Sequence, residues 1–240
     1  MRISALKCYA LAWKGFAKWW IPLCLVSGAI FLFNLLPQIL AAPDMQKLMG
    51  ATGDVLAAAG QDLDTLAAAS ERMNRQLWEM LVPLARITLY IFPAVALFTV
   101  ILLMFANRAV KDSRKKDNSW PWLAYVSLVH VILALGKAAA FCLLFVPGAY
   151  LYIKLMFVPL VMMEQKKDPF AAIAESWRMT QGNFWSLTLL ILMNATVQLV
   201  AMSTVIGIIP ATAFANTARA AAFRMLLDNE PPVLMPVDAQ

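Results

Sequence analysis

The stretch from Asn183 to Ala218, NFWSLTLLILMNATVQLVAMSTVIGIIPATAFANTA, decides the fold class because it contains no Asp, Glu, Lys or Arg. A helix needs about 20 apolar residues to cross the roughly 30 Å hydrocarbon core of a membrane. Extended to Leu227, this run is about twice that length. Gly207 and Pro210 near its middle are residues typical of a turn. We therefore predict two membrane-spanning helices joined by a short turn.

Three further apolar runs come before this one. Residues 20–42 and 87–107 carry no Asp, Glu, Lys or Arg, so each predicts one span. Residues 120–163 are about twice as long as one span, and Pro147–Gly148 near their middle predicts a turn. We expect a second hairpin here, although its second arm is short for a span. The alternative is a re-entrant pair of helices that does not cross the membrane.

The composition is typical of a membrane protein. Hydrophobic residues are 62% of the chain and charged residues 14%, against about 45–50% and about 25% in soluble domains. We expect an all-α fold, a polytopic transmembrane helix bundle of about six spans. A single integral membrane domain is expected over residues 1–228, with a polar, Pro-rich cytoplasmic tail at 229–240.

A segment before the fifth predicted span interrupts the apolar pattern. Asp168 suits a helix N-cap, Pro169 suits the first helical position, and Gly182 offers a left-handed stop. The apolar residues between them recur with the spacing of one helical face. They are Phe170, Ile173, Ala174 and Trp177. We predict a short amphipathic helix that lies at the membrane interface before the span begins.

The N-terminal segment shows the same pattern before the first span. Its apolar residues fall on one side of a helix and its lysines on the other. The apolar residues are Ile3, Leu6, Trp13, Ala17 and Trp20, and the basic ones are Lys7, Lys14 and Lys18. This arrangement predicts a second interfacial helix, with its basic groups toward lipid phosphates.

The distribution of Lys and Arg predicts the orientation in the membrane. Basic residues concentrate in the N-terminal segment, in the loop at 107–120, at 166–178 and near the C-terminal end. A chain of six helices places all of these on one side. Because basic residues mark the cytoplasmic side, we expect both termini to lie in the cytoplasm. The net charge of +6 is assigned to anionic lipid headgroups rather than to nucleic acid.

The non-cytoplasmic segment at 43–80 is alanine-rich and helical in character. Helix caps and breaks are expected at Gly50, Gly53, Asp54 and Gly60. A loose apolar face is expected from Leu63, Leu66, Met73 and Leu77. Two interpretations stay open: a helical hairpin that extends the first two spans, or a docking surface for an outer partner.

The stretch FVPLVMMEQKKDPFAAIAESWRMTQGNFW at 157–185 combines a glutamate, a pair of alanines, Ser176–Trp177 and Gly182–Asn183 before the next span. It resembles a family of bacterial polytopic inner-membrane proteins. They are related to the membrane domain that accompanies some glycerophosphodiester phosphodiesterases. The segment AWKGFAKWW at 12–20 is similar to the start of that family. The resemblance extends over the N-terminal segment and residues 146–227, and it implies a membrane architecture without phosphodiesterase activity.

Polar residues inside the predicted spans are costly and therefore mark candidate functional positions. They are Lys137, Lys154, His130, Glu164, Asn194, Gln198, Asn216 and Arg219. The two lysines either line a cavity for an anionic substrate or lipid headgroup, or extend their ammonium groups to the interface. Pairing the hairpin arms about Pro147–Gly148 places Glu164 near His130, either as a proton relay or as a structural hydrogen bond.

The remaining polar residues are predicted to join helices. Asn194 and Gln198 are one helical turn apart, and the returning helix brings Asn216 opposite Gln198 and beside Arg219. Amide groups in such positions hold membrane helices together through hydrogen bonds.

No motif assembles a nucleophile, a base and an orienting group, and one histidine without a CxxC pair argues against a zinc site. We expect a non-enzymatic protein without a cofactor that acts through membrane lipids, other membrane proteins or a homo-oligomer. The alternative function is transport of a small solute or lipid, with the site near Lys137. A soluble toxin that inserts later is disfavoured, because four apolar runs leave too little polar surface.

Overall fold

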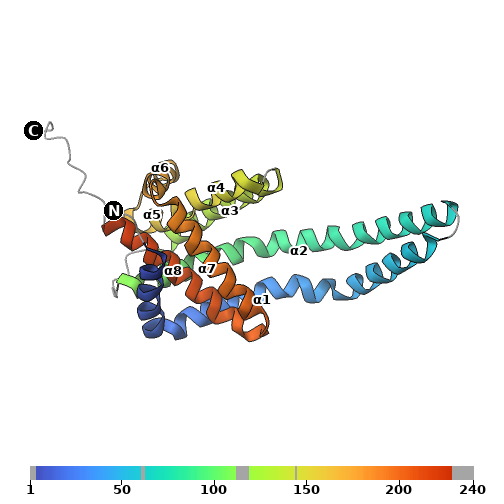
Figure 1. Cartoon of the computed structure of the whole chain (residues 1–240), viewed down its shortest axis with the longest axis horizontal. Coiled ribbons are helices and arrows are strands. Elements are labelled where there is room, and N and C mark those ends of the chain that lie inside the picture. Colours follow the sequence, from blue (N-terminus) through green and yellow to red (C-terminus); the bar gives the residue numbers. More distant parts are fainter. Residues whose placement is uncertain (1–3, 61–62, 112–118, 144, 229–240) are drawn as a thin grey trace, which may run out of the picture. The chain divides into compact units, whose positions relative to one another are not determined.

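The computed structural model describes residues 4–60, 63–111, 119–143 and 145–228. Regular structure in these residues is helical, with no strand among them, so the predicted all-α fold is confirmed (Figure 1). The elements are α1 (Ala5–Ala58), α2 (Leu63–Lys111), α3 (Trp120–Leu143), α4 (Phe145–Lys154), α5 (Val158–Gln165), α6 (Pro169–Thr180), α7 (Phe184–Met202), the 3₁₀ turn η1 (Val205–Gly207) and α8 (Ile208–Asp228). The predicted tail at 229–240 lies outside the described residues.

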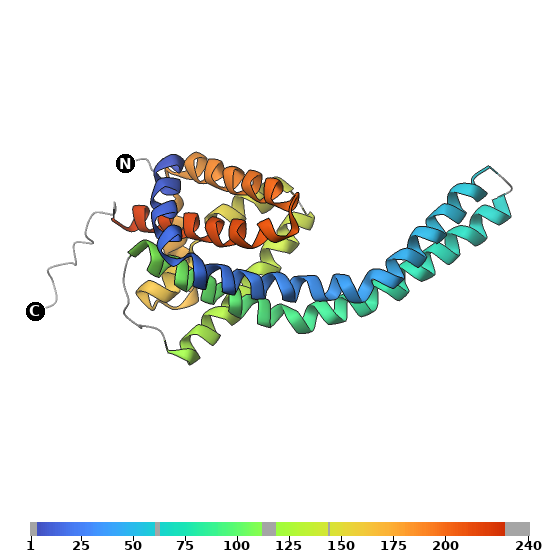
Figure 2. The same ribbon diagram turned by 90° about the horizontal axis from the view of Figure 1, so that it is seen from below.

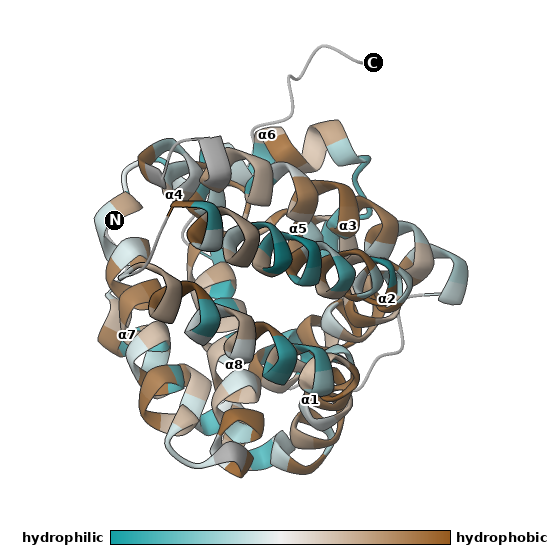
Figure 3. Ribbon diagram, turned by 90° about the vertical axis from the view of Figure 1, so that its right-hand side faces the viewer, coloured by the Kyte–Doolittle hydropathy of each residue, from teal (hydrophilic) through white to brown (hydrophobic). Residues whose placement is uncertain are grey.

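Among the described residues, five helical segments are long and apolar enough to cross a membrane. They are Ala5–Ala58, Leu63–Lys111, Trp120–Phe141, Val146–Gln165 and Phe184–Met202. Hydrophobic residues accordingly recur along α3 and α7 in Figure 3. These segments support an integral membrane protein. The sixth predicted span stays a prediction, because α8 has the length of a span but is rich in alanine and carries Arg219 and Arg224.

The chain forms two compact units, one of residues 1–28 and 96–240 and the other of residues 29–95. The second unit is a helical hairpin from α1 and α2, with Gly60 in its turn (Figure 1). The segment at 43–80 is therefore helical, as expected. The predicted breaks at Gly50 and Gly53 and the cap at Asp54 are wrong, because α1 continues through all three. Tertiary packing of alanine-rich helices outweighs the low helix propensity of single glycines.

A kink at Trp19 divides α1, where the backbone is non-helical at φ −118° and ψ 23°. The kink separates the N-terminal helix, residues 5–18, from the apolar run that follows, at the place the sequence predicts. The face of this helix that packs on the first unit consists of small residues: Ala5, Cys8, Ala12 and Gly15. A Cβ atom at Gly15 would lie 3.1 Å from the carbonyl oxygen of Ala109, so glycine permits the close approach to α2.

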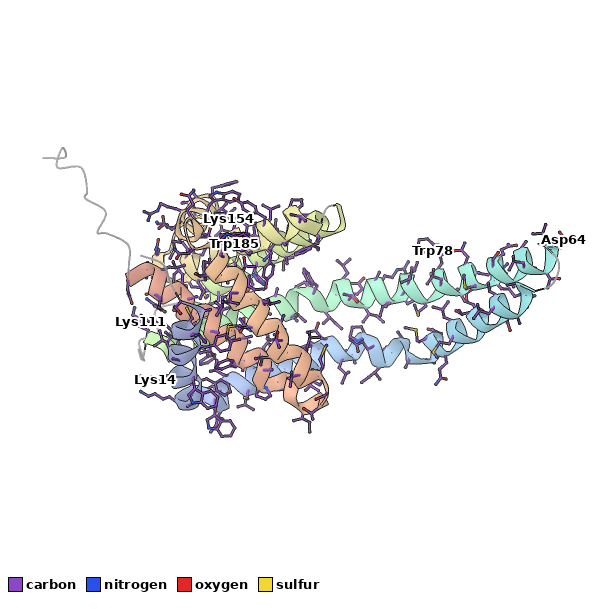
Figure 4. All side chains as sticks on the ribbon, in the orientation of Figure 1. Lys14, Asp64, Trp78, Lys111, Lys154 and Trp185 are labelled. Carbon is purple, nitrogen blue, oxygen red and sulfur yellow. The ribbon has the colours of Figure 1, made fainter. Side chains whose placement is uncertain are left out.

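The predicted apolar face of the N-terminal helix points outward. Leu6, Trp13 and Trp20 are all exposed in the first unit, and Trp13 is 63% exposed. Lys14 also extends away from the ribbon in Figure 4. The exposed surface of this helix therefore combines large apolar and basic side chains.

The turn of the α3–α4 hairpin lies earlier than predicted. Helix α3 ends at Leu143 and α4 begins at Phe145, so Pro147 and Gly148 both lie in the first turn of α4. A proline is tolerated there because the first-turn N–H groups have no partner within the helix. A Cβ atom at Gly148 would lie 2.7 Å from the Cα of Phe141, so this glycine allows α3 and α4 to pack backbone against backbone.

The second arm of this hairpin is broken. Helix α4 ends at Lys154 and residues 155–157 form a turn, so α5 begins only at Val158, with Pro159 in its first turn. Proline lacks the N–H that would continue the helix. Phe157, Val158 and Leu160 are fully buried, so the irregular backbone lies within protein, the environment that membrane proteins require for it.

Helix α6 begins and ends as the sequence predicts. The Asp168 side chain accepts a hydrogen bond of 3.3 Å from the backbone N–H of Ala171, and Gly182 has φ +76°. Ala172, Ser176 and Met179 face the protein, whereas Phe170, which belongs to the predicted apolar face, is 83% exposed. The outward face still carries large apolar side chains, as a helix at a membrane interface requires.

Helices α7 and α8 pack side by side in the first unit, joined by η1 as Gly207 and Pro210 predict (Figure 2). Helix α8 is largely buried, with Ala213, Ala220 and Ala221 fully enclosed. The rings of Phe157 before α5 and Phe223 in α8 lie 5.9 Å apart in the core. The alanine-rich helix can be enclosed in this way because small side chains let neighbours approach closely.

Candidate functional site

A cavity of about 430 Å³ lies in the first unit between α4, α7 and α8. We call it the polar cavity. It is lined by Phe141, Ala149, Tyr152, Ile153, Met156, Thr188, Ile191, Asn194, Ala195, Gln198, Ala215, Asn216 and Arg219. This volume falls within the roughly 300–1,000 Å³ typical of ligand-binding pockets.

The polar cavity brings together four of the predicted site residues. Asn194 and Gln198 come from α7, and Asn216 and Arg219 come from α8. The amide nitrogen of Asn216 donates to the backbone oxygen of Thr212 at 2.9 Å, so this side chain is held by its own helix. These four residues line one cavity, whereas the sequence predicted that they would join the helices through hydrogen bonds.

Tyr9 on the N-terminal helix supports the α7 side of the cavity. Its hydroxyl donates a hydrogen bond of 2.7 Å to Oδ1 of Asn194. Its ring packs edge-on against Phe214 of α8 at 5.1 Å, and the rings of Trp13 and Phe16 also contact Phe214. The N-terminal helix crosses α7 and α8 in Figure 2, and through Tyr9 it contacts both of these cavity-lining helices.

Two cationic side chains share one tyrosine at the edge of the cavity. The guanidinium of Arg219 donates to the hydroxyl of Tyr152 at 2.8 Å, and its carbon lies 5.9 Å from the centre of the same ring. The ammonium of Lys137 on α3 lies 5.4 Å from the centre of that ring. Lys137 does not itself line the cavity, but Tyr152 connects it to Arg219.

No described residue that lines the polar cavity is acidic. In the described part of the chain, Arg219 and Lys137 make the contacts with Tyr152 and no ion pair with a carboxylate. His130 lies on the same face of α3 as Lys137, two helical turns away. Its Nδ1 is buried and has no hydrogen-bond partner within the described protein. This region therefore carries positive charge and a free polar atom that protein groups do not satisfy.

Glu164 does not pair with His130, and that prediction is wrong. Its carboxylate forms an ion pair with Arg224 at 2.6 Å and accepts hydrogen bonds from Lys111 at 2.9 Å and Asn107 at 3.1 Å. The Nε of Arg224 in turn donates to Oδ1 of Asn107 at 2.9 Å. The earlier turn and the break before α5 shift the register of the hairpin arms, so Glu164 faces α2 and α8 instead.

Lys154 is not among the residues that line the polar cavity, and its burial shows that it does not extend outward as one of the two predictions had it. It is 4% exposed, and its ammonium lies 5.5 Å from the Tyr150 ring and 5.3 Å from the Trp177 ring (Figure 4). Cation–π contacts of this kind stabilise a desolvated ammonium. Lys154 is also in the last turn of α4, where a positive charge compensates the helix dipole.

The surface of α6 carries a small ion-pair network. Glu175 binds Arg178 at 2.6 Å and Lys167 at 3.1 Å. Partial burial alone would raise the pKa of Glu175, but the hydrogen bonds and charges of Arg178 and Lys167 outweigh it and hold the pKa below its usual value. This network was not predicted from the sequence, although the spacing of Glu175 and Arg178 is typical of a helical ion pair.

Comparison with known proteins supports the membrane assignment of this site. Residues 134–227 match the family model of the membrane domain of glycerophosphoryl diester phosphodiesterase. The resemblance stated from the sequence is thereby confirmed over that segment, whereas its extension to the N-terminal segment stays a prediction. All residues that line the polar cavity lie within the matched segment. No curated protein and no solved structure matches the chain.

Proposed function

We propose that the protein is a non-enzymatic membrane protein that binds a lipid or a lipid-like amphiphile in the polar cavity. The observation that carries this proposal is that the cavity lining combines apolar side chains with hydrogen-bonding ones. Phe141, Ile153, Met156 and Ile191 provide apolar surface. Asn194, Gln198, Asn216 and Arg219 provide hydrogen-bonding groups. An acyl chain joined to a polar headgroup complements both sides.

The matched family supports this assignment. Its description names the membrane domain of an enzyme of glycerophosphoryl diesters, and residues 134–227 of this chain are similar to that domain. The polar cavity lies wholly within this segment. A membrane domain that accompanies such an enzyme is suited to hold an amphiphile, and an amphiphile bound through packing and hydrogen bonds requires no catalytic group.

We further propose that the membrane is the bacterial inner membrane and that both termini are cytoplasmic. The exposed lysines of the N-terminal helix, Lys7 and Lys14, and the basic end of α2 with Arg108 and Lys111 support this orientation. The exposed apolar face of the N-terminal helix supports contact with the lipid interface on that side.

Transport of the same amphiphile is the second candidate function. The break between α4 and α5 favours it, because broken helices at membrane depth mark the binding sites of many transporters. Ile153 and Met156, which flank or lie in this break, line the polar cavity. Movement of α5 against α4 would therefore change the cavity.

Blocking the cavity tests the binding function. Ala195→Trp places a large side chain in the cavity lining, and Thr196→Trp at the next, exposed position is the matched control. We expect Ala195→Trp to reduce the lipid retained by the purified protein and to abolish its thermal stabilisation by added lipid. Retention equal to that of Thr196→Trp would contradict the proposal. Exchange of labelled lipid between the leaflets of proteoliposomes, sensitive to Ala195→Trp alone, would establish transport.

A further inference from the structure

We propose that the ligand of the polar cavity is a phosphate-type oxyanion, bound by Arg219 with Lys137 behind it. This inference rests on the proposed function and specifies its chemistry. Its starting point is the charge of the site: two cations share Tyr152, and no carboxylate of the described residues faces them.

Uncompensated cations inside a membrane protein require a partner. A charged side chain at membrane depth is costly unless an opposite charge or water compensates it. Tyr152 compensates only in part, because one hydroxyl and one ring face both Arg219 and Lys137. An anion in the adjacent cavity would interact favourably with both cations at once.

Arg219 favours an oxyanion over other anions. The guanidinium presents planar N–H donors that match the oxygen spacing of phosphate and carboxylate, and the bond to Tyr152 occupies only one of its terminal nitrogens. The ammonium of Lys137 adds charge without a fixed direction.

The amides select the rest of the ligand. Asn194 accepts from Tyr9 through its oxygen, so its NH₂ group remains a donor toward the cavity. Gln198 offers both a donor and an acceptor. Groups that donate and accept side by side suit hydroxyls next to the phosphate, whereas the apolar lining suits an acyl chain. The phosphate is therefore either that of a lipid headgroup or a free ion, with the same contacts to Arg219.

Binding of four probes to the full chain in detergent separates these sources. The probes are phosphatidylglycerol, phosphatidic acid, diacylglycerol and inorganic phosphate, and native mass spectrometry measures each affinity. We expect the two anionic lipids to bind at least about tenfold more tightly than diacylglycerol, the effect of one charge-assisted hydrogen bond. Inorganic phosphate that binds and displaces them would identify the free ion as a ligand of the same oxyanion site.

Variants test the assigned residues. Arg219→Gln and Lys137→Met are expected to lower the affinity for phosphatidylglycerol about tenfold, toward that of diacylglycerol, and to leave diacylglycerol binding unchanged. Lys14→Gln removes the same charge from the exposed N-terminal helix and should change neither. If Arg219→Gln does not fold, Arg219→Lys keeps the charge and loses the planar donors, so it should still weaken binding.

The outcomes separate the two proposals. Equal affinities for phosphatidylglycerol and diacylglycerol in the unmodified protein, both reduced by Ala195→Trp, would overturn the oxyanion inference and leave the binding function intact. Affinities that Ala195→Trp does not change for any probe would overturn the binding function itself. Selectivity for anionic lipid that survives both Arg219→Lys and Lys137→Met would also overturn the assignment of this site.

Discussion

The hydroxyl of Ser176 in α6 donates a hydrogen bond of 2.6 Å to the backbone oxygen of Lys154, at the end of α4. Both residues are buried. In a continuous helix this oxygen would accept from the N–H four residues later, but the chain is broken there. Ser176 therefore replaces the bond that the break removes, and the neighbouring Trp177 ring contacts the ammonium of the same lysine.

Ser176→Ala should destabilise the protein by about 1–3 kcal/mol, because it leaves a buried carbonyl oxygen without a partner. Thermal unfolding in detergent measures the effect. The matched control is Thr196→Ala, whose hydroxyl donates to Leu192 on the exposed surface of its own helix. Equal unfolding temperatures for the two variants would show that the Ser176 bond does not stabilise the break.

Gly148→Ala should destabilise the α3–α4 hairpin by about 1–3 kcal/mol through overpacking. The new methyl group would lie 2.7 Å from the Cα of Phe141, which belongs to the backbone and cannot move away freely. Gly136→Ala is the control, since nothing lies within 4 Å of its Cβ position. The control should be neutral or more stable by up to about 1 kcal/mol, the helix-propensity difference between the residues. A stable Gly148→Ala variant would contradict the close packing.

Glu164→Gln should cost about 3 kcal/mol, because it leaves the buried guanidinium of Arg224 without its carboxylate. Adding Arg224→Met should restore much of the stability, since the unpaired charge is then gone. Unfolding in detergent of the single and double variants measures this coupling. Asp44→Asn breaks the exposed pair with Lys47 and should have no measurable effect. Purely additive losses at Glu164 and Arg224 would argue against a coupled pair.

Acid should weaken α6 through Glu175. Its pKa is lower in the folded protein than in the unfolded chain, so the folded state favours the ionised form. The resulting stability is fully present above the unfolded pKa of about 4.3. It is lost as the pH falls through the lower folded value. The unfolding temperatures of the native protein and Glu175→Gln should therefore converge below about pH 4. A difference that stays constant from pH 7 to that range would rule out this ionisation.

Fusion reporters test the orientation. A reporter at Gly60 should be active only outside the cytoplasm, and reporters after residue 118 and at residue 240 only inside. The prediction follows from the basic residues at the ends of the predicted spans. Cytoplasmic activity at Gly60 would reverse the first hairpin and contradict the six-span arrangement.

Local signals in the sequence predict the features whose partners are near in the chain. The cap at Asp168 and the left-handed Gly182 depend on bonds within a few residues, and both occur where expected. The turn at Pro147–Gly148 was misplaced because proline fits a first helical turn as well as a loop. That small shift changed the register of the arms and separated Glu164 from His130.

Contacts between distant residues carried no such signal. Tyr9 and Asn194 are 185 positions apart, and nothing near either residue indicates the bond between them. The pairing of Glu164 with Arg224 had a partial signal, since each is a charge near the end of an apolar run. Periodicity predicts the outward apolar residues of α6 but not the residues that pack on the protein, because a helix between protein and lipid has two such faces.

The burial of α8 has a consequence for how the protein is made. This helix carries two arginines among alanines, so it gains little from direct transfer out of the translocon into lipid. Its arginines instead meet side chains of earlier helices: Arg219 contacts Tyr152, and Arg224 contacts Asn107 and Glu164. Those helices leave the ribosome first. Helix α8 is therefore expected to enter a partly assembled protein, and its insertion depends on residues already in place.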